Sequence, residues 1–392
     1  MSLTRRRLVT GRLSPSPEGT WIAARGREAW AAGDREWQPG TAAPRLVRIS
    51  SNENPLGPGA HVVAAITGTF PQAARYPGNA AAHEGTLIAA LAKTFDATPA
   101  HVTLGAGSGE LLTNAVRAFT SPSRPLVTAW PSFEAPRVTA QKIGTPVREV
   151  GFEAGLKIDL AKMIAAARGA GMVFFCNPNN PTATVHGKAA VADLVKAVRA
   201  ASPDTVILID EAYHDYVTDP SYASAMPLAL STPNVFVART FSKAHGMAGL
   251  RAGYAVGDPA VIARLAAFKT PNAVGTLTLA ASMASLANTA HIAAERARNT
   301  EVRAFTVKAL ADMGVTGTDS QTNFLFADIK RPAAGFRDAC RAAGVLVGRD
   351  FPPFEKQYCR ISIGTMDEMQ RAVAVFRTVL GGGATTSRQG GR

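Results

Sequence analysis

The chain has 392 residues, of which 46% are hydrophobic and 18% are charged, and its formal net charge is +13. This composition is typical of a globular protein with a substantial core and excludes a disordered chain. The arginines and lysines are scattered, with neither zinc-finger spacing nor an aromatic-interleaved RNA motif, so we expect no nucleic-acid partner. A basic surface also suits small anionic ligands such as phosphates and carboxylates, which is the interpretation we prefer.

The cysteines and the N-terminus bear on location. Cys176, Cys340 and Cys359 are odd in number and widely spaced, which indicates neither a disulfide framework nor a metal site. No apolar stretch reaches membrane-spanning length, so we expect no membrane partner. Residues 4–9 (TRRRLV) are similar to the start of a twin-arginine export signal. Residues 10–18 are too polar for the apolar region of such a signal. The expected location is the cytoplasm, with export as the alternative.

The first part of the chain changes character near residue 60. Residues 1–45 are rich in arginine, glycine and proline, and we expect an N-terminal arm with a short helix over 20–33. After residue 60, short apolar runs alternate with helical patterns. The predicted strands are Pro125–Thr128, Met172–Cys176, Thr205–Ile209, Val235–Arg239 and Ala252–Val256, and the predicted helices are Gly85–Ala97, Gly109–Thr120 and Ala189–Ala201. This alternation indicates βαβ units and a largely parallel sheet that is buried on both faces.

Near residue 270 the pattern becomes α+β. One long helix is predicted over Val274–Met313. It is followed by predicted strands at Asn323–Ile329 and Arg360–Gly364 and predicted helices at Ala334–Ala343 and Asp367–Leu380. The sequence therefore predicts an N-terminal arm (1–45), a large domain (46–273), a small α+β domain (274–380) and a disordered tail (381–392).

A lysine stands directly after one of the predicted strands. Thr240, Ser242 and Lys243 follow this strand, and Arg251 comes eight residues after the lysine. A buried lysine is costly unless its charge is neutralised or used, and a desolvated lysine forms Schiff bases with carbonyl groups. The two hydroxyls and the arginine suit a phosphate dianion. Taken alone, the segment also fits a surface Ser-Lys turn.

An acid ends the neighbouring predicted strand. Asp210 follows Ile207–Ile209 and so lies at the carboxyl end of a buried strand, the usual ligand edge of a parallel sheet. An ionised carboxylate there requires a cation, and a protonated pyridine nitrogen is one. A helix N-cap or a Mg²⁺ site of the Walker B type is the alternative. The chain has no G-x-x-x-x-G-K-[ST] segment, so the nucleotide interpretation fails.

Two further segments are directed to the same edge. Residues 177–182 (NPNNPT) follow another strand about thirty residues before Asp210 and can bring an amide there, although their composition also fits a simple turn. Residues 105–110 (GAGSGE) open a helix, where small residues let backbone N–H groups and the helix dipole hold a phosphate. A glycine-rich loop of this kind is weak when it stands alone.

In order and spacing, these segments resemble the class I and II aminotransferases of pyridoxal 5'-phosphate (PLP) fold type I, most closely the histidinol-phosphate aminotransferase branch. The resemblance spans about residues 46–380 and includes residues 51–58 (SNENPLGP), 75–77 (RYP) and 360–364 (RISIG). It implies an α/β fold, in which a large domain with a mostly parallel sheet between helices carries a smaller α+β domain. It also implies PLP as the cofactor.

The resemblance implies roles position by position. Lys243 would hold PLP as a Schiff base and later move the substrate proton, Asp210 would pair with the pyridinium nitrogen, and Tyr213 would bond the ring 3-oxygen. The other cofactor-binding residues would be Ala106, Gly107, Ser108, Phe133 (stacked on the ring), Asn180 (on the 3-oxygen), Thr240, Ser242, Arg251 and, from a neighbouring subunit, Tyr76. The substrate-binding residues would be Arg360, which grips the anionic end, Asn54 and Arg349. No metal site is implied.

The chain departs from the family pattern in three places. Ala183 follows Asn-Pro-Thr where relatives usually have glycine, so the turn must accept a Cβ atom. The added Gly348 and the insertion at 351–354 (FPPF) flank Arg349 and would be expected to displace it. The N-terminal arm is long and carries tryptophans. Because of these departures, the resemblance predicts the substrate less firmly than it predicts the cofactor.

The expected enzyme is a homodimeric PLP-dependent aminotransferase with a ping-pong mechanism. The amino donor would be an amino acid or an amino-alcohol phosphate, with histidinol phosphate first and an aromatic or other biosynthetic amino acid second. The acceptor would be a 2-oxo acid. A decarboxylase or β-lyase is the alternative, because the same fold and lysine serve those reactions. A non-catalytic PLP-binding regulatory module is a further alternative, opposed by the complete catalytic set and by the lack of an appended DNA-binding domain.

Overall fold

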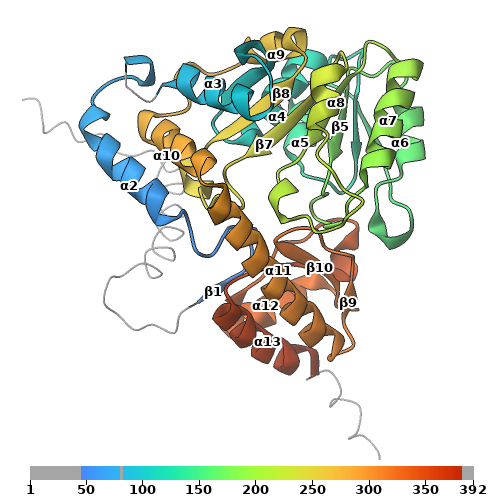
Figure 1. Cartoon of the computed structure of the whole chain (residues 1–392). Coiled ribbons are helices and arrows are strands. Elements are labelled where there is room, and N and C mark those ends of the chain that lie inside the picture. The colour runs from blue at the N-terminus through green and yellow to red at the C-terminus, as the bar shows by residue number, and fades with distance from the viewer. Residues whose placement is uncertain (1–45, 80–82, 382–392) are drawn as a thin grey trace, which may run out of the picture. The chain divides into compact units, whose positions relative to one another are not determined.

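The computed structural model describes residues 46–79 and 83–381 (Figure 1). The predicted N-terminal arm and its helix over 20–33 lie outside the described residues, as does the predicted tail from residue 382. Gly381, which the sequence assigned to that tail, is the last residue of a helix, α13 (Met366–Gly381).

A seven-stranded sheet forms the centre of the large part of the fold, in the order β2-β8-β7-β6-β5-β3-β4. Its strands are β2 (Val102–Gly105), β3 (Leu126–Ala129), β4 (Val147–Val150), β5 (Met172–Cys176), β6 (Val206–Asp210), β7 (Val235–Thr240) and β8 (Gly253–Gly257). All neighbouring pairs are parallel except those of β8, which runs antiparallel to both β2 and β7. The prediction of a largely parallel sheet is therefore confirmed, and each of the five predicted strands is present within a residue or two of its predicted bounds.

Both faces of this sheet are buried. Val173 and Phe175 of β5 belong to one apolar cluster, whereas Phe174 of the same strand belongs to another on the opposite face. Successive residues of a strand point to opposite faces, so an uninterrupted apolar strand fills two cores. Figure 1 shows the sheet between two groups of helices. Residues of α3 (Glu84–Thr94), α6 (Leu160–Ala166) and α7 (Lys188–Ala201) join the first cluster, and those of α4 (Ser108–Phe119), α5 (Ala135–Lys142) and α9 (Pro259–Ala266) join the second.

The single long helix predicted over Val274–Met313 is wrong. Two helices are present instead, α10 (Thr276–Ala287) and α11 (Thr289–Ala311). Asn288 separates them, and its side-chain oxygen accepts the N–H of His291 at 3.1 Å. Asparagine is a strong N-cap residue, and this cap begins a new helix. Helix α2 (Ala60–Thr69), which packs against α10, was not predicted from the sequence.

The C-terminal part builds a second, separate core. Strands β12 (Tyr358–Ser362), β10 (Phe324–Asp328) and β9 (Thr316–Gly317) form an antiparallel sheet. Residues of this sheet, of α11, α12 (Ala333–Ala342) and α13, share one apolar cluster. Strand β1 (Val47–Arg48) pairs with β11 (Val345–Leu346), and Val47 and Ile49 pack in this second core. The domain boundaries remain a prediction, but the start of the described chain contributes to the C-terminal core.

The described residues contain no helix of the length and apolarity that crossing a membrane requires.

Candidate active site

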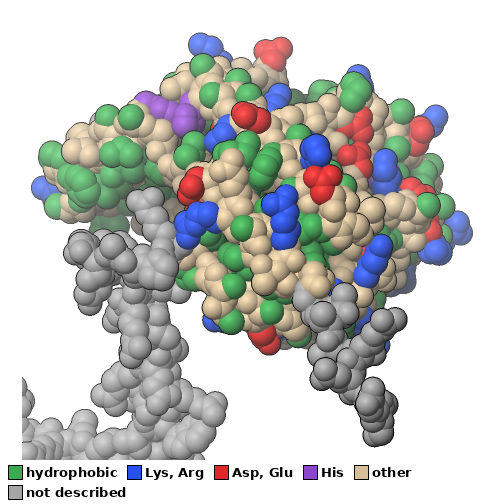
Figure 2. All heavy atoms as spheres, turned by 90° about the horizontal axis from the view of Figure 1, so that it is seen from below, with side chains coloured by type: hydrophobic (Ala, Val, Ile, Leu, Met, Phe, Trp, Pro, Cys, Tyr) green, Lys and Arg blue, Asp and Glu red, His purple; other side chains and the backbone are tan. Residues whose placement is uncertain are grey.

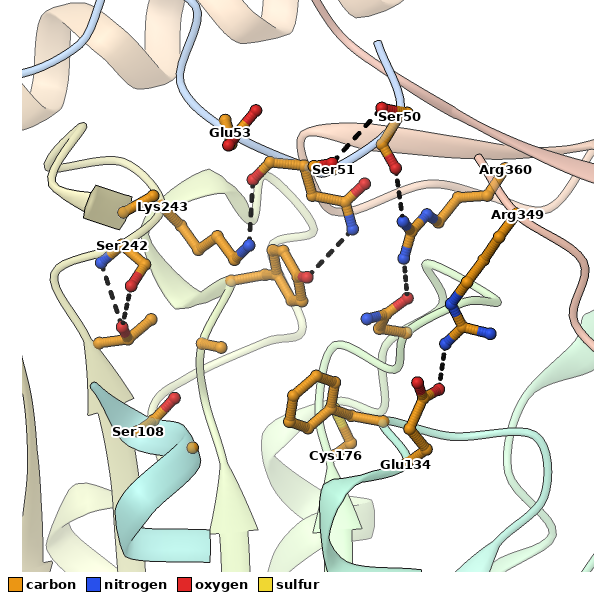
Figure 3. A pocket seen from close by; sticks show the side chains of 18 of the residues that line it. Ser50, Ser51, Glu53, Ser108, Glu134, Cys176, Ser242, Lys243, Arg349 and Arg360 are labelled. Carbon is orange, nitrogen blue, oxygen red and sulfur yellow. Dashed lines mark hydrogen bonds and ion pairs between the residues drawn. The ribbon is translucent and has the colours of Figure 1, made fainter. Parts of the chain in front are cut away.

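A cavity of about 690 Å³ opens at the carboxyl ends of β5, β6 and β7, where Cys176, Asp210 and Thr240 end their strands (Figure 3). This is the edge of a parallel sheet at which ligands usually bind. Of the residues predicted from the sequence, the cavity wall contains Ser108, Phe133, Asn180, Asp210, Tyr213, Thr240, Ser242, Lys243, Arg251, Arg349 and Arg360. The fold thus brings together residues that are scattered over 250 positions of the chain.

Lys243 extends its amine into this cavity from the loop after β7 (Figure 3). Its Nζ donates a hydrogen bond to the backbone oxygen of Asn52 at 3.1 Å. Burial lowers the pKa of Lys243 to about 8, and the nearby charge of Arg360 adds to this lowering. A substantial fraction of the amine is therefore neutral close to physiological pH, as a nucleophile toward carbonyl groups must be.

Asp210 lies at the end of β6 and is buried, because only 2% of the residue is exposed. Burial raises the pKa of Asp210 to about 7. Its Oδ1 accepts the N–H of Ala212 at 3.2 Å, and among the described residues no cationic side chain forms an ion pair with it. Leaving a carboxylate buried without a cation is costly, so this position is suited to a ligand that brings a positive charge.

A set of hydrogen-bond donors converges beside Lys243. Helix α4 begins at Ser108, directly after Gly107 with a φ of +77°. The Arg251 guanidinium donates to Ser242 Oγ at 3.1 Å, and Thr240 Oγ1 donates to the same oxygen at 2.9 Å. A Cβ atom on Gly107 would lie 2.1 Å from Arg251 Nη2, so only glycine allows this approach. A helix N-terminus, hydroxyls and a guanidinium together suit a phosphate dianion.

Tyr213 and Phe133 also line the cavity. Tyr213 is buried, and burial raises the pKa of its hydroxyl, so that the residue stays a neutral phenol. Its Oη accepts a hydrogen bond from Asn52 Nδ2 at 3.1 Å. The Tyr213 phenol can therefore donate its own proton to a ligand in the cavity.

Arg360 lies on the opposite wall, on strand β12. Its Nη1 donates to Asn180 Oδ1 and its Nη2 donates to the Ser50 backbone oxygen, both at 2.8 Å. The Arg360 Nε atom is buried and has no hydrogen-bond partner among the described residues. Burial lowers the pKa of Arg360 to about 10, so the group remains a cation at neutral pH. A buried guanidinium with unused capacity is suited to an anionic substrate group.

The sequence departures are accommodated locally. Arg349, beside the flanking insertion, lines the cavity and forms an ion pair with Glu134, and its displacement relative to the family remains a prediction. The Gly348 N–H donates to the Arg360 backbone oxygen at 2.8 Å, which fixes this segment against β12. Ala183 adopts a φ of 62°, so the turn does carry a Cβ atom in the left-handed region.

Four predicted residues lie outside the cavity wall. Ala106 and Gly107 adjoin Ser108, and the Ala106 N–H donates to Glu110 Oε2 at 2.6 Å. Asn54 donates to the Ala244 backbone oxygen at 3.1 Å and lines a neighbouring cavity of about 340 Å³. Tyr76 is 75% exposed. Their roles remain predictions, and that of Tyr76 requires a second subunit.

Several wall residues were not predicted from the sequence. They are Ser50, Ser51, Asn52, Glu53, Glu134, Cys176, Arg337 and Arg341, among others. Ser51, Asn52 and Glu53 lie within the SNENPLGP segment, so that motif was a usable signal. No sequence signal marked Arg337 and Arg341, because their placement depends on how α12 packs.

The cavity fits PLP by its donor set. Asp210 offers a carboxylate that needs a cation, the N-terminus of α4 with Ser242 and Arg251 offers donors for a phosphate, and Lys243 offers an amine of lowered pKa. These are the complements of a pyridinium nitrogen, a phosphate and an aldehyde, which are the functional groups of PLP.

Comparison with known proteins agrees with a PLP site in this cavity. Residues 44–376 match the family model "Aminotransferase class I and II". A histidinol-phosphate aminotransferase of Symbiobacterium thermophilum is 37% identical over 343 residues, which cover 86% of this chain and 91% of the relative. An aromatic amino acid aminotransferase of Thermobifida fusca is 38% identical over 341 residues, which cover 85% and 90%. The crystal structure of a histidinol-phosphate aminotransferase from Sinorhizobium meliloti, in complex with pyridoxal-5'-phosphate, has the same fold, with a TM-score of 0.79 at 24% identity and a coverage of 97% of this chain and 99% of that one.

The family match spans most of the chain, and both the fold and the chemistry of the cavity agree with it. The protein therefore belongs to the class I and II aminotransferases and is a PLP-dependent enzyme of fold type I.

Proposed function

We propose that the enzyme transfers an amino group between an amino acid, or an amino-alcohol phosphate such as histidinol phosphate, and a 2-oxo acid by a ping-pong mechanism. One observation carries the proposal: the cavity that holds the amine of Lys243 also holds the buried guanidinium of Arg360, whose Nε has no hydrogen-bond partner in the described part of the chain. An anionic substrate bound at Arg360 would have its amino-bearing carbon directed toward Lys243.

Bound PLP would act as the electron sink that makes the substrate Cα–H bond acidic. Asp210 would hold the pyridinium nitrogen, and Ser108, Ser242 and Arg251 would hold the phosphate. This two-ended anchorage fixes the cofactor and reduces the entropy cost of alignment. Phe133 would lie against the ring as an apolar cover.

Lys243 is the chain's general base in this proposal. Its pKa of about 8 makes it an amine that can both accept a proton and return it near neutral pH. The hydrogen bond from Nζ to the Asn52 backbone oxygen holds the amine inside the cavity. The proton accepted from the substrate Cα would be returned to the neighbouring cofactor carbon by the same nitrogen, so a single positioned base suffices.

The substrate end of the cavity is strongly basic. Arg337, Arg341, Arg349 and Arg360 all line it. Arg337 pairs with Asp350 at 2.5 Å and Arg349 pairs with Glu134, whereas neither Arg341 nor Arg360 has an acidic partner among the described residues. This excess of positive charge supports a substrate with a phosphate or more than one carboxylate. Both histidinol phosphate and a dicarboxylic 2-oxo acid meet this condition. The proposal keeps Arg349 and Asn54 as substrate-binding residues.

We further propose that the active unit is a homodimer. Leu56, Val63, Phe70 and Tyr76 are exposed at 60%, 50%, 56% and 75%, and all four lie in or beside α2. Figure 2 shows apolar side chains gathered over the same side of the molecule on which Figure 1 places α2. Large exposed apolar groups of this kind are typical of an interface. A second copy seated there would place Tyr76 of one subunit near the cofactor phosphate of the other.

A half-reaction screen tests the function. Purified PLP-loaded protein is mixed, without any 2-oxo acid, with histidinol phosphate and with a panel of amino acids while its absorption spectrum is followed. Conversion of the cofactor to its pyridoxamine form by one compound establishes the transaminase and identifies the donor. Release of carbon dioxide or a thiol with the starting spectrum restored would instead establish a decarboxylase or β-lyase. Lys243→Ala should lose the visible absorbance and the turnover, and retained turnover would overturn the proposal.

A further inference from the structure

Asn52 connects the C-terminal sheet to two of the proposed catalytic residues. It is 1% exposed and adopts a φ of 57°, in the left-handed region that asparagine tolerates better than most residues. Its backbone oxygen accepts from Lys243 Nζ, its side-chain Nδ2 donates to Tyr213 Oη, and its Oδ1 accepts from Ser362 Oγ at 2.7 Å. This contact joins two residues that are 310 positions apart in the sequence.

The direction of each hydrogen bond in this chain follows from the donor inventory. The Asn52 backbone N–H can only donate, and it donates to Ser362 Oγ at 2.9 Å. The hydroxyl of Ser362 has one proton, and among the described residues its acceptor is Asn52 Oδ1. The Asn52 amide is thereby oriented with Oδ1 toward Ser362 and Nδ2 toward Tyr213. The reverse orientation would leave the Ser362 proton without an acceptor in the described part of the chain.

This orientation decides what Tyr213 does. Because Nδ2 can only donate, Tyr213 Oη is the acceptor, and the phenol proton must be directed elsewhere. No described group accepts that proton, and Tyr213 lines the cavity. We propose that Ser362 and Asn52 form a polarity relay, in which the Ser362 hydroxyl fixes the Asn52 amide so that Tyr213 presents its proton to the cofactor ring oxygen. Asn52 and Ser362 are positioning residues, and the inference rests on the proposed role of Tyr213 at that oxygen.

The relay has a spectroscopic consequence. A proton donated to the ring oxygen stabilises the anionic oxygen, so the nearby nitrogen that joins the cofactor to Lys243 retains its proton less strongly. Loss of this donor should raise the pH midpoint of the visible absorbance change. A hydrogen bond to a charged acceptor is stronger than one to a neutral acceptor, so loss of this donor should shift the midpoint by roughly one to two pH units.

The test is a pH titration of the visible absorbance of the PLP-loaded enzyme. Ser362→Ala removes the hydroxyl, so the Asn52 amide is free to turn and present Oδ1 to Tyr213, which then donates away from the cofactor. We expect the midpoint to rise by about one unit, close to the rise in Tyr213→Phe. Ser362→Thr keeps the hydroxyl and should restore the original midpoint. Ser320→Ala is the matched control, because it removes another buried hydroxyl beside the same sheet that does not contact Asn52 or Tyr213.

A second variant keeps the test decisive if Ser362→Ala folds poorly. Asn52→Asp conserves the shape and the tolerated φ but replaces the donor Nδ2 with an acceptor. Its negative charge raises the midpoint by itself, so it is compared with the double variant Asn52→Asp/Tyr213→Phe. A shift that is larger in the native background than in Tyr213→Phe supports the relay. The PLP dissociation constant and the melting temperature of the cofactor-free variants show whether the fold is kept.

The relay is overturned if Ser362→Ala leaves the midpoint unchanged while Tyr213→Phe raises it, and the role of Tyr213 then stands. It is also overturned if the shift in Asn52→Asp is the same with and without the Tyr213 hydroxyl. If Tyr213→Phe itself causes no shift, both the relay and the Tyr213 assignment fail. Failure of the proposed function is a separate result, since it appears as visible absorbance that does not depend on Lys243 or as a half-reaction without the pyridoxamine form.

Discussion

The Cys176 sulfur lies 3.9 Å from Asp210 Oδ2, at the adjacent ends of β5 and β6. Both residues are buried, and burial raises the pKa of each. The thiol therefore remains protonated and offers the carboxylate a weak donor, in place of the full positive charge that Asp210 lacks among its described neighbours. In the cofactor-free enzyme, burial of the Asp210 carboxylate therefore lowers the stability of the fold.

Asp210→Asn should therefore stabilise the cofactor-free protein at high pH. The folded pKa of about 7 lies above the ordinary value of 3.8, so the favourable protonated form is fully present below pH 4 and is lost as the pH rises through 7. The asparagine variant has no such titrating group, so its free energy of unfolding does not fall in this way. The difference in unfolding free energy between the variant and the native protein should grow between pH 5 and pH 8 to at most about 4 kcal/mol. Urea unfolding at both pH values measures it. An advantage that does not grow with pH would contradict the burial argument.

Arg360→Gln should raise the pH at which the cofactor-free enzyme captures PLP. Arg360 is the second cause, after burial, of the lowered pKa of Lys243, so its removal should move that pKa upward from about 8. We expect a shift of some tenths to about one unit, which is typical of one partly shielded charge. The measurement is the pH dependence of the rate at which the visible absorbance appears. Arg337→Gln, on the same cavity wall, is the control and should leave the midpoint in place.

Gly107→Ala should weaken PLP binding at least about tenfold. Gly107 has a φ of 77° and a ψ of 165°, a backbone region that is essentially restricted to glycine and costs another residue roughly 1–3 kcal/mol, and the Cβ atom would also displace the Arg251 guanidinium. Gly335→Ala is the control, because Gly335 lies in α12 and not in the cavity wall, its Cβ atom would meet no atom within 4 Å, and alanine favours the helix. Equilibrium titration with PLP compares the two. Equal affinities would show that the phosphate is not held at this turn.

Glu134→Gln should improve binding of a phosphate-bearing donor. Glu134 forms an ion pair with Arg349, and both side chains are partly exposed, so the pair is weak and the competition modest. We expect a KM two- to fivefold lower for histidinol phosphate, consistent with about 0.4–1 kcal/mol, and an unchanged KM for an aromatic amino acid. Steady-state kinetics with both donors tests this. The gain should disappear in Glu134→Gln/Arg349→Gln, and a gain that persists there would contradict the role of Arg349.

Phe70→Glu should convert the proposed dimer into a monomer. Phe70 is 56% exposed beside α2, and a buried unpaired carboxylate at an interface costs several kcal/mol. Phe268→Glu is the control, since Phe268 is 45% exposed but lies after α9, away from α2 in the sequence. Molar mass from light scattering distinguishes the two states. A Phe70→Glu variant that keeps the mass of a dimer would exclude this surface as the interface.

The central sheet and the cofactor side of the cavity were predictable from the sequence for a physical reason. Apolar strands buried on both faces have a strong local signature, and parallel strands deliver the residues after their carboxyl ends to one edge. Asp210 ends one such strand and Lys243 follows the next, so their proximity required no knowledge of side-chain packing.

The remainder depends on contacts that local patterns do not encode. Asn52 contacts Ser362, which is 310 positions away in the sequence, and its backbone is left-handed. Hydrophobic periodicity predicts neither feature. Arg341 enters the cavity wall through the packing of α12, and Asn288 divides a continuous helical pattern with a single cap. The placement of the segment around Arg349 also depends on such a contact, the hydrogen bond from the Gly348 N–H to the Arg360 backbone oxygen of β12.

Strand β12 carries both Arg360 and Ser362, which pair with Phe326 and Phe324 of β10. They are two residues apart and so point to the same side, while Ile361 packs in the C-terminal core. Inserting one residue into β12 would exchange these sides. Substrate capture and the orientation of the phenol proton would then fail together, so a shift of register in this strand could not alter one while sparing the other.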